Sequence, residues 1–276
     1  MLFLQYHVPM VRTHDGEEIS DSTDFDALAL RVLQGKASLG GPLPSDDWPG
    51  SHASTFWCKT LRDMPLGEAF ARAIAGHVAS DDPAVRFQAL VFFDGCADAP
   101  GREAIVPVVE RDPTRFLGYE HWGYSIERKL VDVINALVKK SDAGAIRYMR
   151  ASVVRPQPPD ALVGVACVWD REWTLENLES IAAATPTAAP RLLESLAFDE
   201  SSALVVAPPL LRVAGVDRSA LEAFVRKLVP DSVRAAAILA APAPAAPAPP
   251  VATMPAPSPP RAAPARKRPP TRTMKA

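Results

Sequence analysis

Histidine and cysteine offer the widest range of chemistry in this chain, but their spacing defines no site. The five histidines are scattered, and none shares metal-ligand spacing with a cysteine or a carboxylate on one helical face. Cys58, Cys96 and Cys167 are an odd number at wide intervals, which fits neither a disulfide framework nor a zinc ligand set. We therefore expect reduced, buried thiols, no metal and no cofactor.

Local signatures of catalysis are also lacking. The sequence has no serine nucleophile elbow and no local Cys–His pair. Gly40-Gly41-Pro42 follows a predicted helix, whereas a phosphate-binding glycine loop follows a strand. A triad that is assembled only by folding would leave no such signature. On these grounds we expect a protein that is not an enzyme.

Aromatic side chains form two groups that suit the binding of a partner. One group contains Phe116, Tyr119, His121, Trp122 and Tyr124. In the other, Trp169 and Trp173 flank Asp170-Arg171-Glu172. Aromatic residues and arginine are the usual hot-spot residues of interfaces. The alternative is that these rings fill gaps between helical layers. Burial separates the two interpretations, and an exposed Trp122 would favour binding.

Charge is distributed unevenly along the chain. Six of the 30 basic residues and none of the 32 acidic residues lie beyond residue 240, so residues 1–240 carry a formal charge of about −8. An acidic body is a poor ligand for phosphate backbones. The tail can bind nucleic acid, an anionic surface or an acidic partner, or it can be a solubilising extension. Its basic residues are Arg261, Arg266, Lys267, Arg268, Arg272 and Lys275.

An internal sequence repeat indicates the helices that position these residues. Residues 82–111 and 124–152 repeat a pair of amphipathic helices at an offset of about 41 residues. Val85, Leu90 and Ile105 define the apolar faces of the first pair, and Leu130 and Ile146 lie on those of the second. A helix pair with one apolar face cannot bury that face alone, so successive pairs must stack.

The first pair resembles a HEAT-type helical repeat. Asp82-Pro83-Ala84-Val85-Arg86 is followed by Ala89-Leu90 and by a second helix through Ala104-Ile105-Val106-Pro107, and the Asp-Pro turn recurs at Asp112-Pro113. The resemblance covers residues 66–152 and departs from the pattern at Tyr124–Glu127, where the Asp-Pro cap is missing. It implies an all-α, HEAT-like solenoid in which Val85 enters the core. It also implies that Asp82 and Arg86 take part in contacts between successive units.

We predict three parts of the chain. Residues 1–64 hold a possible strand at 2–11, one helix at 24–34 capped by Ser22, and a long irregular connection from 35 to 64. Residues 65–240 form the helical repeat domain, in which Pro208-Pro209 should break or kink a helix. Residues 241–276 are rich in alanine and proline and should be disordered. Further helices are expected near 159–168, 174–184, 187–198, 202–214, 217–229 and 231–240.

The sequence also bears on where the protein works. Its start has no basic n-region typical of a secretory signal, and its longest apolar stretch, residues 203–211, is less than half as long as a membrane span. We expect a cytoplasmic protein. Its richness in alanine, arginine and proline is typical of high-GC bacterial genomes.

These observations predict a non-enzymatic protein-interaction or scaffold module. A first alternative is an immunity-type inhibitor whose acidic surface neutralises a toxin, such as a nuclease with a basic cleft. A more remote alternative follows from the HEAT resemblance, because some HEAT-like proteins are DNA glycosylases that use an aspartate with tryptophan and arginine. Trp169, Asp170, Arg171 and Trp173 share that composition, but their order matches no motif that would transfer the roles.

Overall fold

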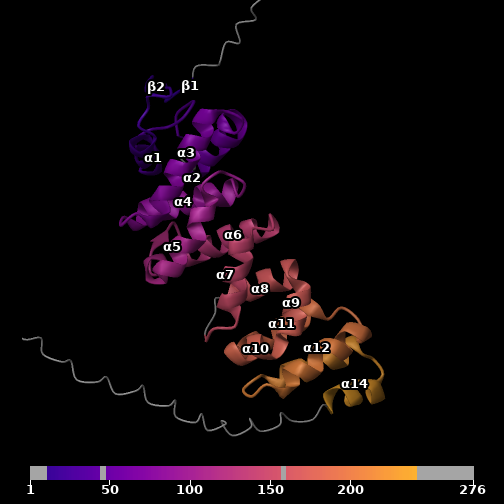
Figure 1. The fold of residues 1–276 in the computed structure, drawn as a ribbon. Coiled ribbons are helices and arrows are strands. Elements are labelled where there is room, and N and C mark those ends of the chain that lie inside the picture. Colours follow the sequence, from indigo (N-terminus) through magenta and orange to yellow (C-terminus); the bar gives the residue numbers. More distant parts are fainter. Residues whose placement is uncertain (1–10, 44–47, 157–159, 241–276) are drawn as a thin grey trace, which may run out of the picture. The chain divides into compact units, whose positions relative to one another are not determined.

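The computed structural model describes residues 11–43, 48–156 and 160–240, which are mostly helical (Figure 1). The α-helices of this part are α1 (Phe25–Leu33), α2 (Pro49–Phe56), α3 (Pro65–Gly76), α4 (Pro83–Gly95), α5 (Ile105–Arg111), α6 (Ile126–Lys139), α7 (Ala143–Val153), α8 (Asp160–Trp169), α9 (Arg171–Glu176), α10 (Leu178–Ala184), α11 (Ala189–Leu196), α12 (Glu200–Arg212), α13 (Arg218–Leu228) and α14 (Ser232–Leu239). The predicted all-α class is confirmed.

Two short antiparallel hairpins accompany the helices in the described residues. Strand β1 (Val11–Arg12) pairs with β2 (Glu18–Ile19), and β3 (Glu120–His121) pairs with β4 (Tyr124–Ser125). Residues 2–10 of the predicted N-terminal strand and the whole predicted tail lie outside the described residues. No helix of the described part has both the length and the apolar character needed to cross a bilayer.

Short-range side-chain bonds set where several helices begin. The Asp82 carboxylate accepts a hydrogen bond of 2.9 Å from the Ala84 amide, and Pro83 occupies the first position of α4, where its missing amide proton costs no bond. Asp217 and Asp231 cap α13 and α14 in the same way. These three predicted caps follow from the sequence because capping depends only on residues within one turn.

Two other caps differ from the prediction or were not expected. The Ser125 hydroxyl accepts a hydrogen bond from the Arg128 amide at 3.1 Å, so serine caps α6 where the Asp-Pro pattern is interrupted. The cap of α1 is Asp24, whereas the sequence predicted Ser22. The Ser22 hydroxyl instead shares a hydrogen bond of 2.9 Å with the Ser20 hydroxyl.

Removal of the Asp82 cap gives a first prediction. Asp82→Ala should lower the free energy of unfolding by about 1 kcal/mol, because the Ala84 amide then loses its acceptor at the start of α4. Asp82→Asn is the matched control, since its side-chain oxygen still caps. Urea unfolding followed by circular dichroism measures both. Equal losses in the two variants would show that the charge of Asp82, and not its cap, matters.

Helices that are neighbours in sequence order pack beside one another (Figure 1). Helix α1 contacts α3, α2 contacts α4, and α4 contacts α6. Helix α6 in turn contacts α7 and α8, and α8 contacts α11. Nearer the C-terminal end, α12 packs against α10, α11, α13 and α14. Most of these contacts join helices that are one or two elements apart along the chain.

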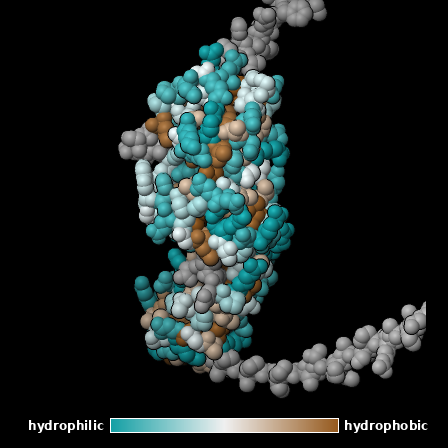
Figure 2. Space-filling view, turned by 90° about the vertical axis from the view of Figure 1, so that its left-hand side faces the viewer, coloured by the Kyte–Doolittle hydropathy of each residue, from teal (hydrophilic) through white to brown (hydrophobic). Residues whose placement is uncertain are grey.

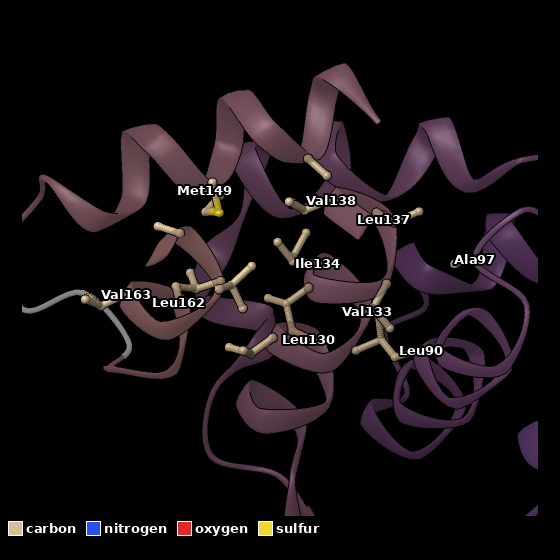
Figure 3. Packing of buried hydrophobic residues seen from close by; sticks show 14 of the residues in the cluster. Leu90, Ala97, Leu130, Val133, Ile134, Leu137, Val138, Met149, Leu162 and Val163 are labelled. Carbon is tan, nitrogen blue, oxygen red and sulfur yellow. The ribbon is translucent and has the colours of Figure 1, made fainter. Parts of the chain in front are cut away.

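The core around α6 illustrates how these faces are buried. Leu130 and Ile134 of α6 lie beside Met149 of α7 and Leu162 of α8, and all four are buried (Figure 3). On another side of α6, Val133 lies near the buried Leu90 of α4 (Figure 3). The predicted core positions Val85, Leu90, Ile105 and Leu130 are buried, and Ile146 is half-buried. The apolar faces that the internal repeat predicted therefore belong to the hydrophobic core.

Arginine side chains tie the two Asp-Pro turns together. The buried Arg86 guanidinium donates a 2.7 Å hydrogen bond to the Arg115 carbonyl oxygen, at the turn that follows Asp112. Arg115 reaches back, donating 2.7 Å to the Ala79 carbonyl oxygen and pairing with Asp112 at 3.0 Å. Arg86 thus bridges successive helical segments, whereas Asp82 caps its own helix.

The predicted long irregular connection from 35 to 64 is wrong in part. Gly35 ends α1 with a positive φ of 67°, as predicted. Residues 49–61, however, form α2 and a π-helical turn, η1 (Trp57–Leu61). Pro49 starts α2 at the position where helices accept proline. The buried Trp57 then donates its Nε1 proton to the Gly67 carbonyl oxygen at 2.8 Å, which fixes η1 against α3. Tertiary contacts therefore stabilise helical structure in a segment whose glycines and prolines predicted a loop.

Of the predicted break or kink at Pro208-Pro209, the break is wrong, since α12 continues through both prolines. Proline removes the amide donors that would bond the carbonyls of Leu204 and Val205. Those two residues are exposed, so water can bond their carbonyls. The helix predicted at 174–184 is in turn divided at Asn177 into α9 and α10.

Candidate functional site

The β3–β4 hairpin presents a tryptophan in a strained backbone conformation. His121 pairs with Tyr124, so Trp122 and Gly123 form a two-residue loop. Their φ values are 50° and 78°, which defines a type I′ turn. Such turns prefer Asn-Gly, and a bulky residue at positive φ is an outlier that costs roughly 1–2 kcal/mol. Trp122 is nevertheless 65% exposed, so burial of its ring does not offset this cost.

Trp48, at the start of α2, supports the hairpin from a distant part of the chain. Its ring centroid lies 5.2 Å from that of Tyr124 and 6.0 Å from that of His121. The buried Phe87 of α4 lies 5.4 Å from Trp48 on the inner side. His121 stacks on Trp122 with centroids 5.5 Å apart and an angle of 9° between the planes. We call Trp48, His121, Trp122 and Tyr124 the aromatic cluster.

Tyr119 also approaches the aromatic cluster, but from the protein interior. It is half-buried, and its ring centroid lies 5.9 Å from that of Phe87. Burial raises the pKa of Tyr119, and the nearby negative charge of Asp82 raises it further. The four predicted residues between 119 and 124 are therefore brought together, with Trp122 and Tyr124 outermost and Tyr119 as packing beneath them.

A buried cation lies beneath the cluster. The Lys129 ammonium of α6 is 5.7 Å from the Trp48 ring centroid, a distance at which the ring face attracts it. It forms ion pairs with Asp94 at 2.8 Å and with Asp132 at 3.3 Å. Burial acts to lower the pKa of Lys129, but the two carboxylates outweigh burial and raise it. Lys129 is therefore a fixed positive charge that holds Trp48 and α6 together.

A second aromatic position lies at the other end of α6. Trp169 is 44% exposed, and its Nε1 atom donates to Asn135 Oδ1 at 2.8 Å. The Lys139 ammonium lies 5.6 Å from its ring centroid. The neighbouring Val168 is 66% exposed. Trp169 thus offers an open ring whose orientation is fixed by α6.

A surface pocket of about 410 Å³ lies between α6 and α8. Its lining includes Arg128, Asp132 and Asn135 of α6, and Val165, Val168 and Trp169 of α8. Asp132 faces this pocket and also pairs with Lys129, so the pocket adjoins the aromatic cluster. We call the aromatic cluster, the pocket and Trp169 together the α6 surface. Hydrophobic residues on the face seen in Figure 2 likewise form small groups among hydrophilic ones.

Trp173, which the sequence placed in one group with Trp169, makes different contacts. Its ring lies 5.3 Å from the Arg150 guanidinium. Arg150 also donates two hydrogen bonds to the Asp170 carboxylate, at 2.6 and 3.0 Å. The Arg171 guanidinium lies 4.3 Å from the Phe198 ring centroid. Asp170 is held in a bidentate ion pair, and this arrangement gives the glycosylase alternative no support.

The sequence missed several residues of this surface. Trp48, Lys129 and Asn135 were not among the predicted binding residues. For Lys129 and Asn135, the sequence signal was the spacing of polar residues along α6, which places Lys129, Asp132, Asn135 and Lys139 on successive turns of one face. The predicted basic tail residues lie outside the described residues. Within the described part, no three His, Cys, Asp or Glu side chains gather as a metal site requires.

Comparison with protein-family models, with curated proteins and with solved structures found no match for this chain. Its function is therefore inferred from its own side chains. The two ends of the α6 surface carry exposed aromatic rings, and charged groups lie between them.

Proposed function

We propose that this chain is a non-enzymatic interaction module that binds a protein partner through the α6 surface. The observation that carries the proposal is Trp122, which is 65% exposed at a φ of 50°. Strained residues cluster at functional sites. Selection for stability alone would favour an unstrained residue at such a position. Tryptophan and tyrosine are also the residues that contribute most to binding when a partner covers them.

The layout of the α6 surface supports the same proposal. Interfaces combine aromatic anchors with a polar, hydrogen-bonding rim. Here the anchors are Trp122 and Tyr124 at one end and Trp169 at the other, and the 14 residues of α6 run between them. A helix of this length spans about 20 Å, which suits a helix or an extended segment of a partner.

The same proposal includes a HEAT-like stack of helix pairs. Contacts from α2 to α4, from α4 to α6 and from α6 to α8 support it, as does the bridge from Arg86 to the next Asp-Pro turn. In such a stack each pair contacts mainly its neighbours, and the exposed helices form one continuous binding face. The α6 surface would be part of that face.

A second candidate is the immunity-type inhibitor of a toxin. It is favoured by the formal charge of about −8 on residues 1–240. A negative protein attracts a partner with a basic cleft, which raises the rate and the selectivity of association. The aromatic cluster would then supply the contacts that remain after charges are screened.

Site-specific crosslinking tests whether the α6 surface binds a protein. A photoreactive amino acid is placed at position 122 and, as a control, at position 233 of α14, where Val233 is 76% exposed. We expect one protein adduct from position 122 that is not formed from position 233. The same set of adducts from both positions would contradict the proposal, because it would indicate random encounters.

Salt dependence separates the two candidates once the partner is known. An immunity protein should capture one basic toxin, and the affinity should fall steeply between low and high salt because exposed charges are screened. A scaffold that relies on aromatic anchors should show little change. Deletion of residues 241–276 completes the comparison, since unchanged capture would leave the basic tail without a role in binding.

A further inference from the structure

Two of the three cysteines lie together, although they are 38 residues apart in the sequence. Cys58 belongs to the π-helical turn η1, and Cys96 follows α4. Their Sγ atoms are 2.9 Å apart, which is hydrogen-bonding distance for two thiols and longer than a disulfide bond, about 2.05 Å. The expectation that all three thiols are buried is wrong, because Cys58 is exposed whereas Cys96 and Cys167 are buried.

Close packing of α2 against the end of α4 holds the two sulfur atoms at this distance. A Cβ atom on Gly95 would lie only 2.4 Å from Ser54 Oγ, so glycine is needed where the two helices meet. The Cys96 thiol donates to the Ser54 carbonyl oxygen at 3.3 Å. The π-helical turn then places Cys58 directly over Cys96. π-helical turns are frequent at functional sites.

We propose that Cys58 and Cys96 are a dithiol site that forms an intramolecular disulfide with a small disulfide oxidant, of which glutathione disulfide is the type. Cys58, as the thiolate, attacks one sulfur of the oxidant, a mixed disulfide forms, and one glutathione thiolate leaves. Cys96 then loses its proton to solvent and attacks Cys58 Sγ, and the second glutathione leaves as its thiolate. Two protein thiols are oxidised to one disulfide, and one oxidant disulfide is reduced to two glutathione thiolates, which take up from solvent the two protons that Cys58 and Cys96 release.

Exposure determines the order of these two steps. An oxidant in solution reaches Cys58 but not the buried Cys96. Burial raises the pKa of Cys96, and its hydrogen bond with Cys58 raises it further, so Cys96 is the weaker first nucleophile. It becomes the resolving thiol because it lies next to the sulfur it attacks. Cys167 in α8 is an internal control, since burial raises its pKa to about 11 and no cysteine adjoins it in the described residues.

Oxidation of the full chain tests the proposal. The protein is incubated with glutathione disulfide, denatured, and alkylated, and its intact mass and peptides are measured. We expect one alkylated thiol in place of three, no retained glutathione, and a linked peptide pair containing Cys58 and Cys96. A stable glutathione adduct on the native chain, a linkage between two chains, or three alkylated thiols would each overturn the proposal.

Two single variants separate the roles of the sulfur atoms. Cys96→Ser should retain one glutathione on Cys58, because no thiol resolves the mixed disulfide. Cys58→Ser should remain unmodified, and Cys167→Ser should still form the disulfide. In the wild-type chain the cross-link should raise the midpoint of thermal unfolding by about 5–10 °C over the reduced protein. If the variants fail to fold, the wild-type peptide map alone decides the outcome.

Discussion

Replacement of Trp122 by asparagine is expected to weaken binding of the crosslinked partner by at least about 30-fold, while the stability of the protein is unchanged or raised. The binding loss follows from the removal of an exposed anchor, since hot-spot side chains contribute about 2 kcal/mol or more. The stability result follows from the turn. Trp122 has a φ of 50° and precedes Gly123, and Asn-Gly is the preferred pair for a type I′ hairpin.

This opposite behaviour of binding and stability is what distinguishes a binding residue from a structural one. If Trp122 only packed on His121, its removal would lower stability by the value of a stacked aromatic pair, about 0.5–1.5 kcal/mol. The matched control is Val233→Asn, which places the same residue at another exposed position. Titration calorimetry and urea unfolding measure the two quantities. Unchanged affinity in Trp122→Asn would reject the α6 surface as the binding site.

What the sequence predicted correctly is local in character. The Asp82 cap and the burial of Val85 and Leu90 depend on residues within one or two helical turns. Helical spacing carries that information directly, because side chains three and four positions apart share a face. The all-α class followed from the same spacing repeated along the chain.

What the sequence could not predict depends on contacts between distant segments. Trp48 reaches the hairpin only because α2 packs on α4, and the Cys58–Cys96 pair depends on the same packing. The hairpin itself was missed because Trp-Gly is not the usual Asn-Gly or Asp-Gly signal of a two-residue turn. That departure from the local rule is the feature that now points to function, since functional sites are where local preferences are overridden.

The site therefore depends on the packing of α2 on α4, and Gly50, like Gly95, permits this packing. A Cβ atom at position 50 would lie 2.1 Å from the Gln88 carbonyl oxygen of α4 and 3.0 Å from Val91 Cβ. The Gly50 amide also donates to the Gln88 side-chain oxygen at 3.0 Å. No side-chain rotation relieves a contact with a backbone atom, so the two helices must move apart.

Gly50→Ala should accordingly lower the free energy of unfolding by at least about 2 kcal/mol, because overpacking outweighs the gain in helix propensity. Gly76→Ala is the matched control. Gly76 is a helical residue of α3 with no atom within 4 Å of an added Cβ, and its replacement should stabilise by about 0.5–1 kcal/mol. Urea unfolding compares the two variants, and equal stability of Gly50→Ala and the wild type would contradict the close approach. Because Trp48 lies two residues before Gly50, displacement of α2 should also withdraw Trp48 from Tyr124 and weaken partner binding.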